Sequence, residues 1–226
     1  MFRPGRNCDI KQVIDNKMPK VSKKIILLGI LAIGVLSIFT VKSVVSRSTV
    51  QVHSKEPARV KGNDNAPVKI TEYVDFQCPS CAEGAKYLKE IMDKYPGKIR
   101  LEVKYYPLIL VHRHALLSAY YAECAARQGR FWSFYDYFFE HQAEWSNLTD
   151  AKPFFDRFAR KLGLNLAGLE TCLQDENVYE TVRKSKDEGK LLKVSSTPTY
   201  FINGSMVVGK KQLAPELEKF LNETKN

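Results

Sequence analysis

The chain has 226 residues, of which 44% are hydrophobic and 27% are charged, so it can form one full domain with an appendage and is not a disordered polymer. The formal net charge is +10, but residues 1–24 carry seven Lys and Arg side chains against two Asp, and the lysines of the remainder alternate with acids. This distribution argues against a nucleic-acid-binding protein and indicates an ordinary solvated surface after residue 24.

An uncharged apolar run, IILLGILAIGVLSIFTV, occupies residues 25–41. It has no polar face, so it is typical of a membrane-spanning helix, and residues up to 45 bring it to the thickness of a bilayer core. We expect a cytoplasmic basic segment at 1–24 and a single-pass signal anchor at 25–45, because lysines precede the apolar run. A cleaved signal peptide is the alternative, although SVVSRS is a poor cleavage site.

Residues 46–65 are polar and lack periodicity, which predicts a tether between the bilayer and a folded domain at 66–226. VKITEYVDF (68–76) is typical of a buried strand, and the apolar side chains after it recur at helical spacing until Pro96-Gly97. KIRLEVKYY (98–106) alternates as a strand does. The series predicts a parallel strand–helix–strand unit.

The segment from about 109 to 193 is helical in character, and we expect its helices within 114–129, 131–145, 151–163, 165–174 and 177–192. TPTYFINGSMVVG (197–209) returns to strand, with Asn203-Gly204 as a type I′ hairpin turn. LAPELEKFLNE is predicted to form a final helix with Pro215 in its first turn. The predicted fold class is therefore α/β, a small sheet covered by helices, with a helical subdomain inserted in its middle.

The sequence DFQCPSC places Cys78 and Cys81 between the first strand and its helix. Pro79 fits the first helical position, so Cys78 becomes the N-cap, where backbone N–H groups stabilise a thiolate. Cys81 is expected to be the less exposed thiol that resolves a mixed disulfide. A structural disulfide and a zinc site are the alternatives. We expect no metal, because only the loop histidines at 112 and 114 offer a further ligand pair.

DFQCPSC, followed far downstream by STPTYFING, resembles the DsbA-like thiol–disulfide oxidoreductases of the thioredoxin fold, and ARQGRFWSFYDYFFEHQ resembles their inserted helical domain. The resemblance covers about residues 60–225. It implies that Cys78 is the nucleophile, that Cys81 is the resolving thiol, and that Pro198 is a cis proline facing the sulfurs. It also implies that main-chain groups of Thr197 pair with a substrate strand.

The same resemblance implies that Glu72 is a semi-buried acid that relays protons to Cys81. A surface residue at the edge of a strand is the alternative for Glu72. The chain departs from the best-known oxidants of the family, because Pro-Ser stands between its cysteines where they carry Pro-His. Serine supplies no positive charge, so we expect a weaker oxidant.

The predicted topology also accounts for the odd number of cysteines. Cys8 would be a free thiol on the reducing side, and four cysteines would lie on the oxidising side. We predict a structural disulfide between Cys124 and Cys172 in the helical subdomain, with two buried free thiols as the alternative.

These features predict a membrane-tethered, extracytoplasmic thiol–disulfide oxidoreductase that oxidises cysteine pairs in exported proteins without a bound cofactor. The catalytic domain would lie in the periplasm or at the cell surface. The resemblance implies re-oxidation by a membrane quinone-linked partner of the DsbB or VKOR type. A reductase or isomerase on the same scaffold, and a substrate-binding chaperone with an incidental dithiol, are the alternatives.

Overall fold

The computed structural model describes residues 59–223, which form a five-stranded sheet and eight helices. The predicted basic segment, the signal anchor, Cys8 and most of the predicted tether lie outside these residues. Among residues 59–223, none of the helices combines the length and the apolar character needed to cross a bilayer.

The sheet has the strand order β1-β3-β2-β4-β5. Its central strand, β2, runs parallel to β3 and antiparallel to β4, so the predicted parallel unit is present. Residues of β3 alternate between buried and half-buried, as the sequence pattern requires. The strands are β1 (Val60–Gly62), β2 (Val68–Val74), β3 (Ile99–Tyr105), β4 (Thr199–Ile202) and β5 (Ser205–Val208).

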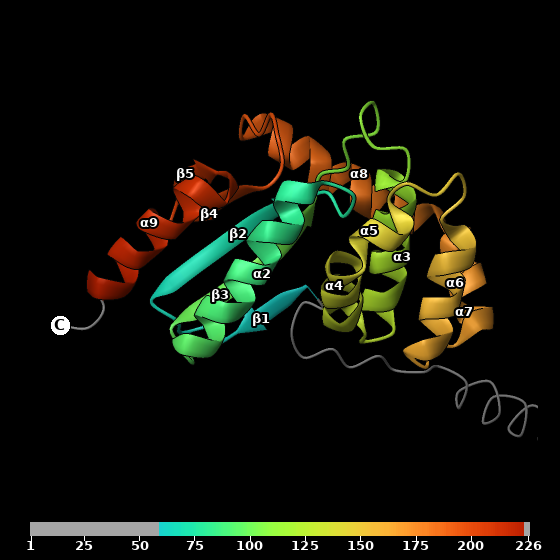
Figure 1. Ribbon diagram of the computed structural model, residues 1–226, viewed down its shortest axis with the longest axis horizontal. Helices are drawn as coiled ribbons and strands as arrows, with labels where there is room; N and C mark the ends of the chain where they lie inside the picture. Colours follow the sequence, from blue (N-terminus) through green and yellow to red (C-terminus); the bar gives the residue numbers. More distant parts are fainter. Residues whose placement is uncertain (1–58, 224–226) are drawn as a thin grey trace, which may run out of the picture. The chain divides into compact units, whose positions relative to one another are not determined.

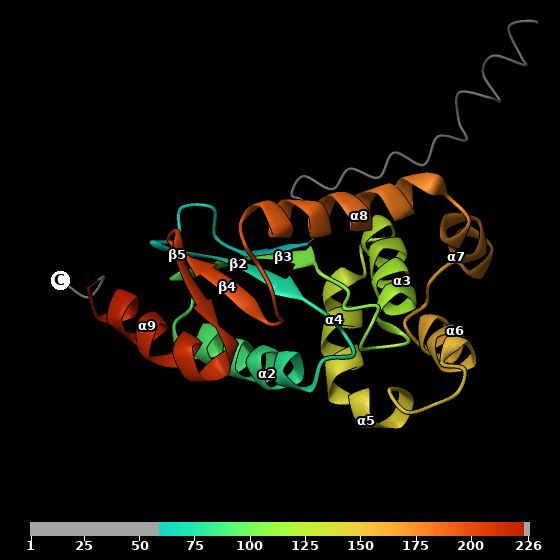
Figure 2. The same cartoon turned by 90° about the horizontal axis from the view of Figure 1, so that it is seen from above.

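Helices cover both faces of the sheet. α2 (Pro79–Lys94) and α9 (Gly209–Glu223) lie on one face, and α8 (Glu176–Leu191) crosses the other (Figure 2). α8 packs closely, because a Cβ atom at Gly189 would lie 2.8 Å from the ring of Tyr106 and 2.9 Å from that of Tyr73. Glu72 and Tyr73 are neighbours in β2, so their side chains point to opposite faces, Glu72 toward α2 and Tyr73 toward α8.

The predicted helical insertion separates β3 from β4 and lies beside the sheet (Figure 1). Its core is aromatic, with Phe134, Phe138, Phe155 and Trp145 fully buried. It comprises α3 (Ala115–Arg127), α4 (Phe131–Glu140), α5 (Gln142–Trp145), α6 (Lys152–Lys161) and α7 (Leu166–Leu173), and it continues into α8.

Three predicted boundaries are wrong. The tether was expected to extend to residue 65, but β1 pairs with β3 and buries Val60, because a short edge strand needs few apolar residues. The helix expected over 131–145 is interrupted at His141 (ψ 17°), where the indole of Trp145 donates to the carbonyl of Phe138. The last helix begins at Gly209, so Pro215 lies inside it and not in its first turn.

The hairpin turn was predicted correctly. Asn203 and Gly204 have φ angles of 47° and 92°, the left-handed values that a type I′ turn requires at both central positions. The side chain of Asn203 also accepts the backbone N–H of Lys69 at 2.8 Å, which ties the turn to the start of β2. The turn therefore fixes the register of β4 against β2, and with it the position of the loop that precedes β4.

Candidate active site

Cys78 and Cys81 lie at the amino end of α2. Cys78 is the N-cap residue in an extended conformation (φ −75°, ψ 121°), and Pro79 is the first residue of the helix. Both cysteines are free; Cys78 is 8% exposed and Cys81 is fully buried. The structure therefore places both thiols where the sequence predicts them, with only one within reach of a protein substrate.

The loop before β4 faces the dithiol. The peptide bond between Thr197 and Pro198 is cis, as the resemblance implies. The thiol of Cys78 donates to the main-chain carbonyl of Thr197 at 3.3 Å, across 119 residues of sequence. The predicted dithiol and the predicted cis proline loop are therefore neighbours in the fold.

The pKa values of the two thiols are shifted in opposite directions. A hydrogen bond from Cys81 is the largest cause that lowers the pKa of Cys78 to about 6, against the opposing effect of burial. The backbone N–H groups of Cys81 and Ser80 lower it further. Burial is the main cause that raises the pKa of Cys81 well above its ordinary value, and the neighbouring sulfur of Cys78 adds to it. At neutral pH Cys78 is therefore the thiolate and Cys81 the thiol.

Glu72 lies in the middle of β2, beneath the dithiol, and is completely buried. The surface alternative for Glu72 is therefore wrong. The hydroxyl of Tyr135 in α4 donates to Oε2 of Glu72 at 2.7 Å. Burial raises the pKa of Glu72 to about 7, while the hydroxyls of Tyr135 and Tyr200 act in the opposite direction. A carboxyl group with this pKa can give or take a proton near neutral pH.

Side chains that sequence reasoning missed hold the loop before Cys78. The amide of Gln142 donates to the carbonyls of Phe76 at 2.7 Å and of Cys78 at 3.0 Å. Gln77 donates to the carbonyl of Ser146 at 2.7 Å and accepts the backbone N–H of His114 at 2.6 Å. These bonds join residues far apart in the chain, so no local pattern in the sequence marks them.

The loop histidines that offered a zinc alternative have structural partners. Nδ1 of His112 lies 2.9 Å from a carboxylate oxygen of the buried Asp75, and Nε2 of His114 lies 2.7 Å from the carbonyl of Leu148. Asp75 also accepts the backbone N–H groups of Gln77 and Leu108. Within residues 59–223, no three His, Cys, Asp or Glu side chains are grouped as metal ligands.

Cys124 of α3 and Cys172 of α7 form a disulfide bond, which is the predicted pairing. The bond connects two helices of the insertion, and its cysteines are 48 residues apart in sequence. The bond lies in a different part of the domain from the free thiols of α2, so the described residues contain one structural pair and one dithiol.

Comparisons with known proteins agree with this architecture. A family model described as Thioredoxin matches residues 54–223. The chain is similar to the oxidised BdbD of Bacillus subtilis, with a TM-score of 0.64 and 22% identity over 74% of this chain and 93% of that chain. It is also similar to alpha-DsbA1 of Wolbachia pipientis, with a TM-score of 0.63 and 22% identity over 73% and 89%. These likenesses confirm the predicted thioredoxin fold with a helical insertion.

A curated relative has a different context. The chain is 36% identical over 145 residues to the protein named Na(+)/H(+) antiporter NhaA 3 of Salinispora tropica. The match covers 64% of this chain and 21% of the antiporter, so this chain spans about a fifth of the length of that relative. The remainder of the antiporter lies outside the match.

Proposed function

Because the chain belongs to the thioredoxin family, we propose that it is a thiol–disulfide oxidoreductase that oxidises cysteine pairs in exported proteins. The observation that carries the proposal is the pairing of an acidic, slightly exposed Cys78 with a buried, protonated Cys81. A structural disulfide has no need of such an asymmetry, whereas an exchange reaction does.

The reaction begins with the Cys78–Cys81 disulfide. A substrate thiolate attacks the sulfur of Cys78, a mixed disulfide forms, and the sulfur of Cys81 leaves with the electron pair and takes a proton from Glu72. A second substrate thiolate then attacks the substrate sulfur of the mixed disulfide and releases the thiolate of Cys78. The substrate dithiol is oxidised, the protein dithiol is reduced, and Glu72 regains its proton from solvent.

The low pKa of Cys78 favours the oxidising direction. A stabilised thiolate is a good leaving group in the second step, and it stabilises the reduced protein relative to the disulfide form. The Pro-Ser pair supplies no imidazolium, yet the pKa of Cys78 still falls to about 6, because the thiol of Cys81 donates a hydrogen bond and the backbone N–H groups of Cys81 and Ser80 act in the same direction. Oxidase activity is therefore compatible with the departure from the family pattern.

The test measures both the oxidation of a substrate protein and the reduction potential of the Cys78–Cys81 pair. The oxidised full chain is mixed with a reduced, unfolded protein that requires disulfides, and the Cys78–Cys81 potential is measured against glutathione. We expect substrate oxidation that is lost in Cys78→Ala, and a potential well above the roughly −270 mV of thioredoxin. A potential near that of thioredoxin would indicate a reductase instead, and unchanged activity in Cys78→Ala would contradict both.

We also propose that residues 25–45 anchor the domain to the outer side of a cell membrane, where a quinone-linked membrane protein re-oxidises it. The proposal is supported by the apolar run and by the lysines before it. A membrane-impermeant maleimide added to intact cells should label reduced Cys78 and leave Cys8 unlabelled until the cells are lysed. Labelling of Cys8 in intact cells would contradict this topology.

A further inference from the structure

We propose that Tyr135 is the positioning residue for Glu72, so that the helical insertion sets the pH range in which Cys81 exchanges its proton. The inference rests on the proposed dithiol exchange and on the proton transfer by Glu72. Tyr135 lies outside the sheet and α2, so under this proposal a residue of the insertion influences the proton transfer between Glu72 and Cys81.

Within the described part of the chain, a single hydrogen bond, made to one of its two oxygens, holds the carboxyl group of Glu72. Oε2 of Glu72 accepts the phenol of Tyr135 at 2.7 Å, and among the described residues Oε1 has no hydrogen-bond partner. A carboxyl group fixed at one oxygen has a defined orientation and keeps its second oxygen for a proton. In this proposal Oε1, the oxygen that Tyr135 leaves free, exchanges the proton with Cys81.

The groups around Glu72 come from several elements. Cys81 belongs to α2 and Cys78 is its N-cap, Tyr135 belongs to α4 and Tyr200 to β4, and the residue paired with Glu72 in β3 is the apolar Val103. Tyr200 is a weaker candidate for the positioning role: it lies close enough to lower the pKa of Glu72, but its hydroxyl makes no hydrogen bond of normal length to a described residue. Its position is set by α2, since a Cβ atom at Gly84 would lie 1.9 Å from that hydroxyl.

Tyr135 is itself held rigidly. Its side chain is 3% exposed, and its ring packs edge-on against Phe76 at 6.2 Å and Phe139 at 5.0 Å between centroids. The phenol therefore has one position from which to reach Glu72. A phenylalanine at this position would keep the ring contacts and remove only the hydroxyl.

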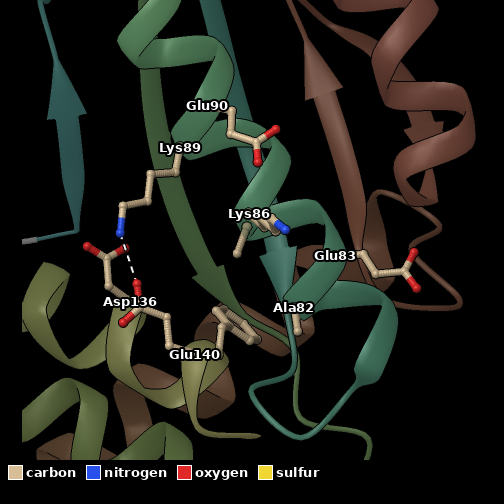
Figure 3. A pocket seen from close by; sticks show the side chains of 9 residues that line it. Ala82, Glu83, Lys86, Lys89, Glu90, Asp136 and Glu140 are labelled. Atoms are coloured by element: carbon tan, nitrogen blue, oxygen red, sulfur yellow. Dashed lines mark hydrogen bonds and ion pairs between the residues drawn. The ribbon is translucent and has the colours of Figure 1, made fainter.

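The helix that carries Tyr135 is also tied to α2. Lys89 of α2 pairs with Glu140 of α4 at 2.9 Å, at the edge of a pocket of about 550 Å³ between the two helices (Figure 3). Gln142, just beyond α4, bonds the carbonyl of Cys78. The dithiol and Tyr135 are therefore parts of one connected structure, although Cys81 and Tyr135 are 54 residues apart in the sequence.

The direction of the effect follows from the charge. A phenol that donates to a carboxylate stabilises the charged form and lowers the pKa of Glu72. Removal of the hydroxyl leaves the burial in place and raises this pKa. The pH at which Glu72 changes from acid to base moves upward by about one unit, since a hydrogen bond to a charged group has that order of strength.

The test is the pH–rate profile for single-turnover oxidation of a reduced dithiol peptide by the oxidised full chain. We expect Tyr135→Phe to move the inflection near pH 7 upward by about one unit, and Glu72→Gln to abolish it. The matched control is Tyr105→Phe, which removes a buried hydroxyl that donates at 3.1 Å to a different carboxylate, that of Glu123. This control should leave the inflection in place.

The outcomes separate the two proposals. Exchange that persists in Tyr135→Phe with the wild-type profile, or an inflection that persists in Glu72→Gln, would overturn the role of Tyr135. An absence of exchange in the wild-type protein would overturn the proposed function instead. Tyr135→Met removes the phenol with a different apolar side chain, so it provides a second variant if the first does not fold.

Discussion

At the scale of single residues, the acidity of Cys78 depends on its neighbour more than on the helix. The sequence predicted that the amino end of α2 would stabilise the thiolate, and backbone N–H groups do contribute. The largest contribution, however, is the hydrogen bond from the thiol of Cys81. The resolving cysteine therefore also activates the nucleophile while the dithiol is reduced.

Replacement of Cys81 by alanine should raise the pKa of Cys78. The variant removes the main donor to the thiolate, while burial still disfavours the charge. The measurement is the pH dependence of Cys78 alkylation, with a midpoint at about 6 expected in the reduced wild-type protein. Cys81→Ser retains a hydrogen-bond donor, so its alkylation midpoint should lie between those of the wild type and Cys81→Ala. An unchanged midpoint in Cys81→Ala would show that the helix end dominates.

At the scale of elements, the active site is assembled by three parts of the chain that meet only in the folded domain. α2 carries the dithiol, the loop before β4 carries the cis proline, and the insertion supplies Tyr135 and Gln142. The insertion in turn contains the Cys124–Cys172 disulfide. The stability that the disulfide gives to the insertion and the acidity of Cys78 can therefore be measured separately.

Removal of that disulfide by Cys124→Ala with Cys172→Ala should lower the free energy of unfolding by about 2–4 kcal/mol, because the bond closes a long loop in the unfolded chain. The pKa of Cys78 should not change, since neither cysteine contacts the dithiol loop. Urea denaturation and the alkylation assay measure the two quantities. Thr171→Ala, at an exposed site in the same helix, is the matched control. An equal loss of unfolding free energy in Thr171→Ala would show that the missing disulfide is not the cause.

At the scale of the whole molecule, the buried carboxyl group of Glu72 makes stability depend on pH. The folded protein raises the pKa of this group from its ordinary value of 4.5 to about 7. The folded state therefore holds a proton that the unfolded state releases between these values, and the free energy of unfolding falls as the pH rises through this window. Cys78 has the opposite sign, because its lowered pKa favours the folded state as the pH rises above about 6.

Glu72→Gln isolates the first effect, because Cys78 contributes to both proteins. In the reduced state the variant should match the wild type at pH 4 and exceed its free energy of unfolding by about 3 kcal/mol at pH 8. Denaturation at both pH values measures the difference. Glu123→Gln is the comparison variant at a second buried carboxylate, which is paired with Arg59, and it should not show this gain. A difference between wild type and Glu72→Gln that is independent of pH would contradict the assigned titration.

The sequence alone determined the features that depend on local chemistry. Alternation and helical spacing predict β2, β3 and the helices of the insertion, Pro79 predicts the start of α2, and Asn203-Gly204 predicts the hairpin. Tertiary structure alone decided the burial of Glu72, its hydrogen bond to Tyr135, the hydrogen bond from Gln142 to the carbonyl of Cys78, and the short edge strand β1. The physical reason is distance along the chain, because Glu72 and Tyr135 are 63 residues apart and their pairing leaves no periodic signal. A local pattern records the conformation of its own backbone, whereas a buried polar contact exists only after distant elements have packed together.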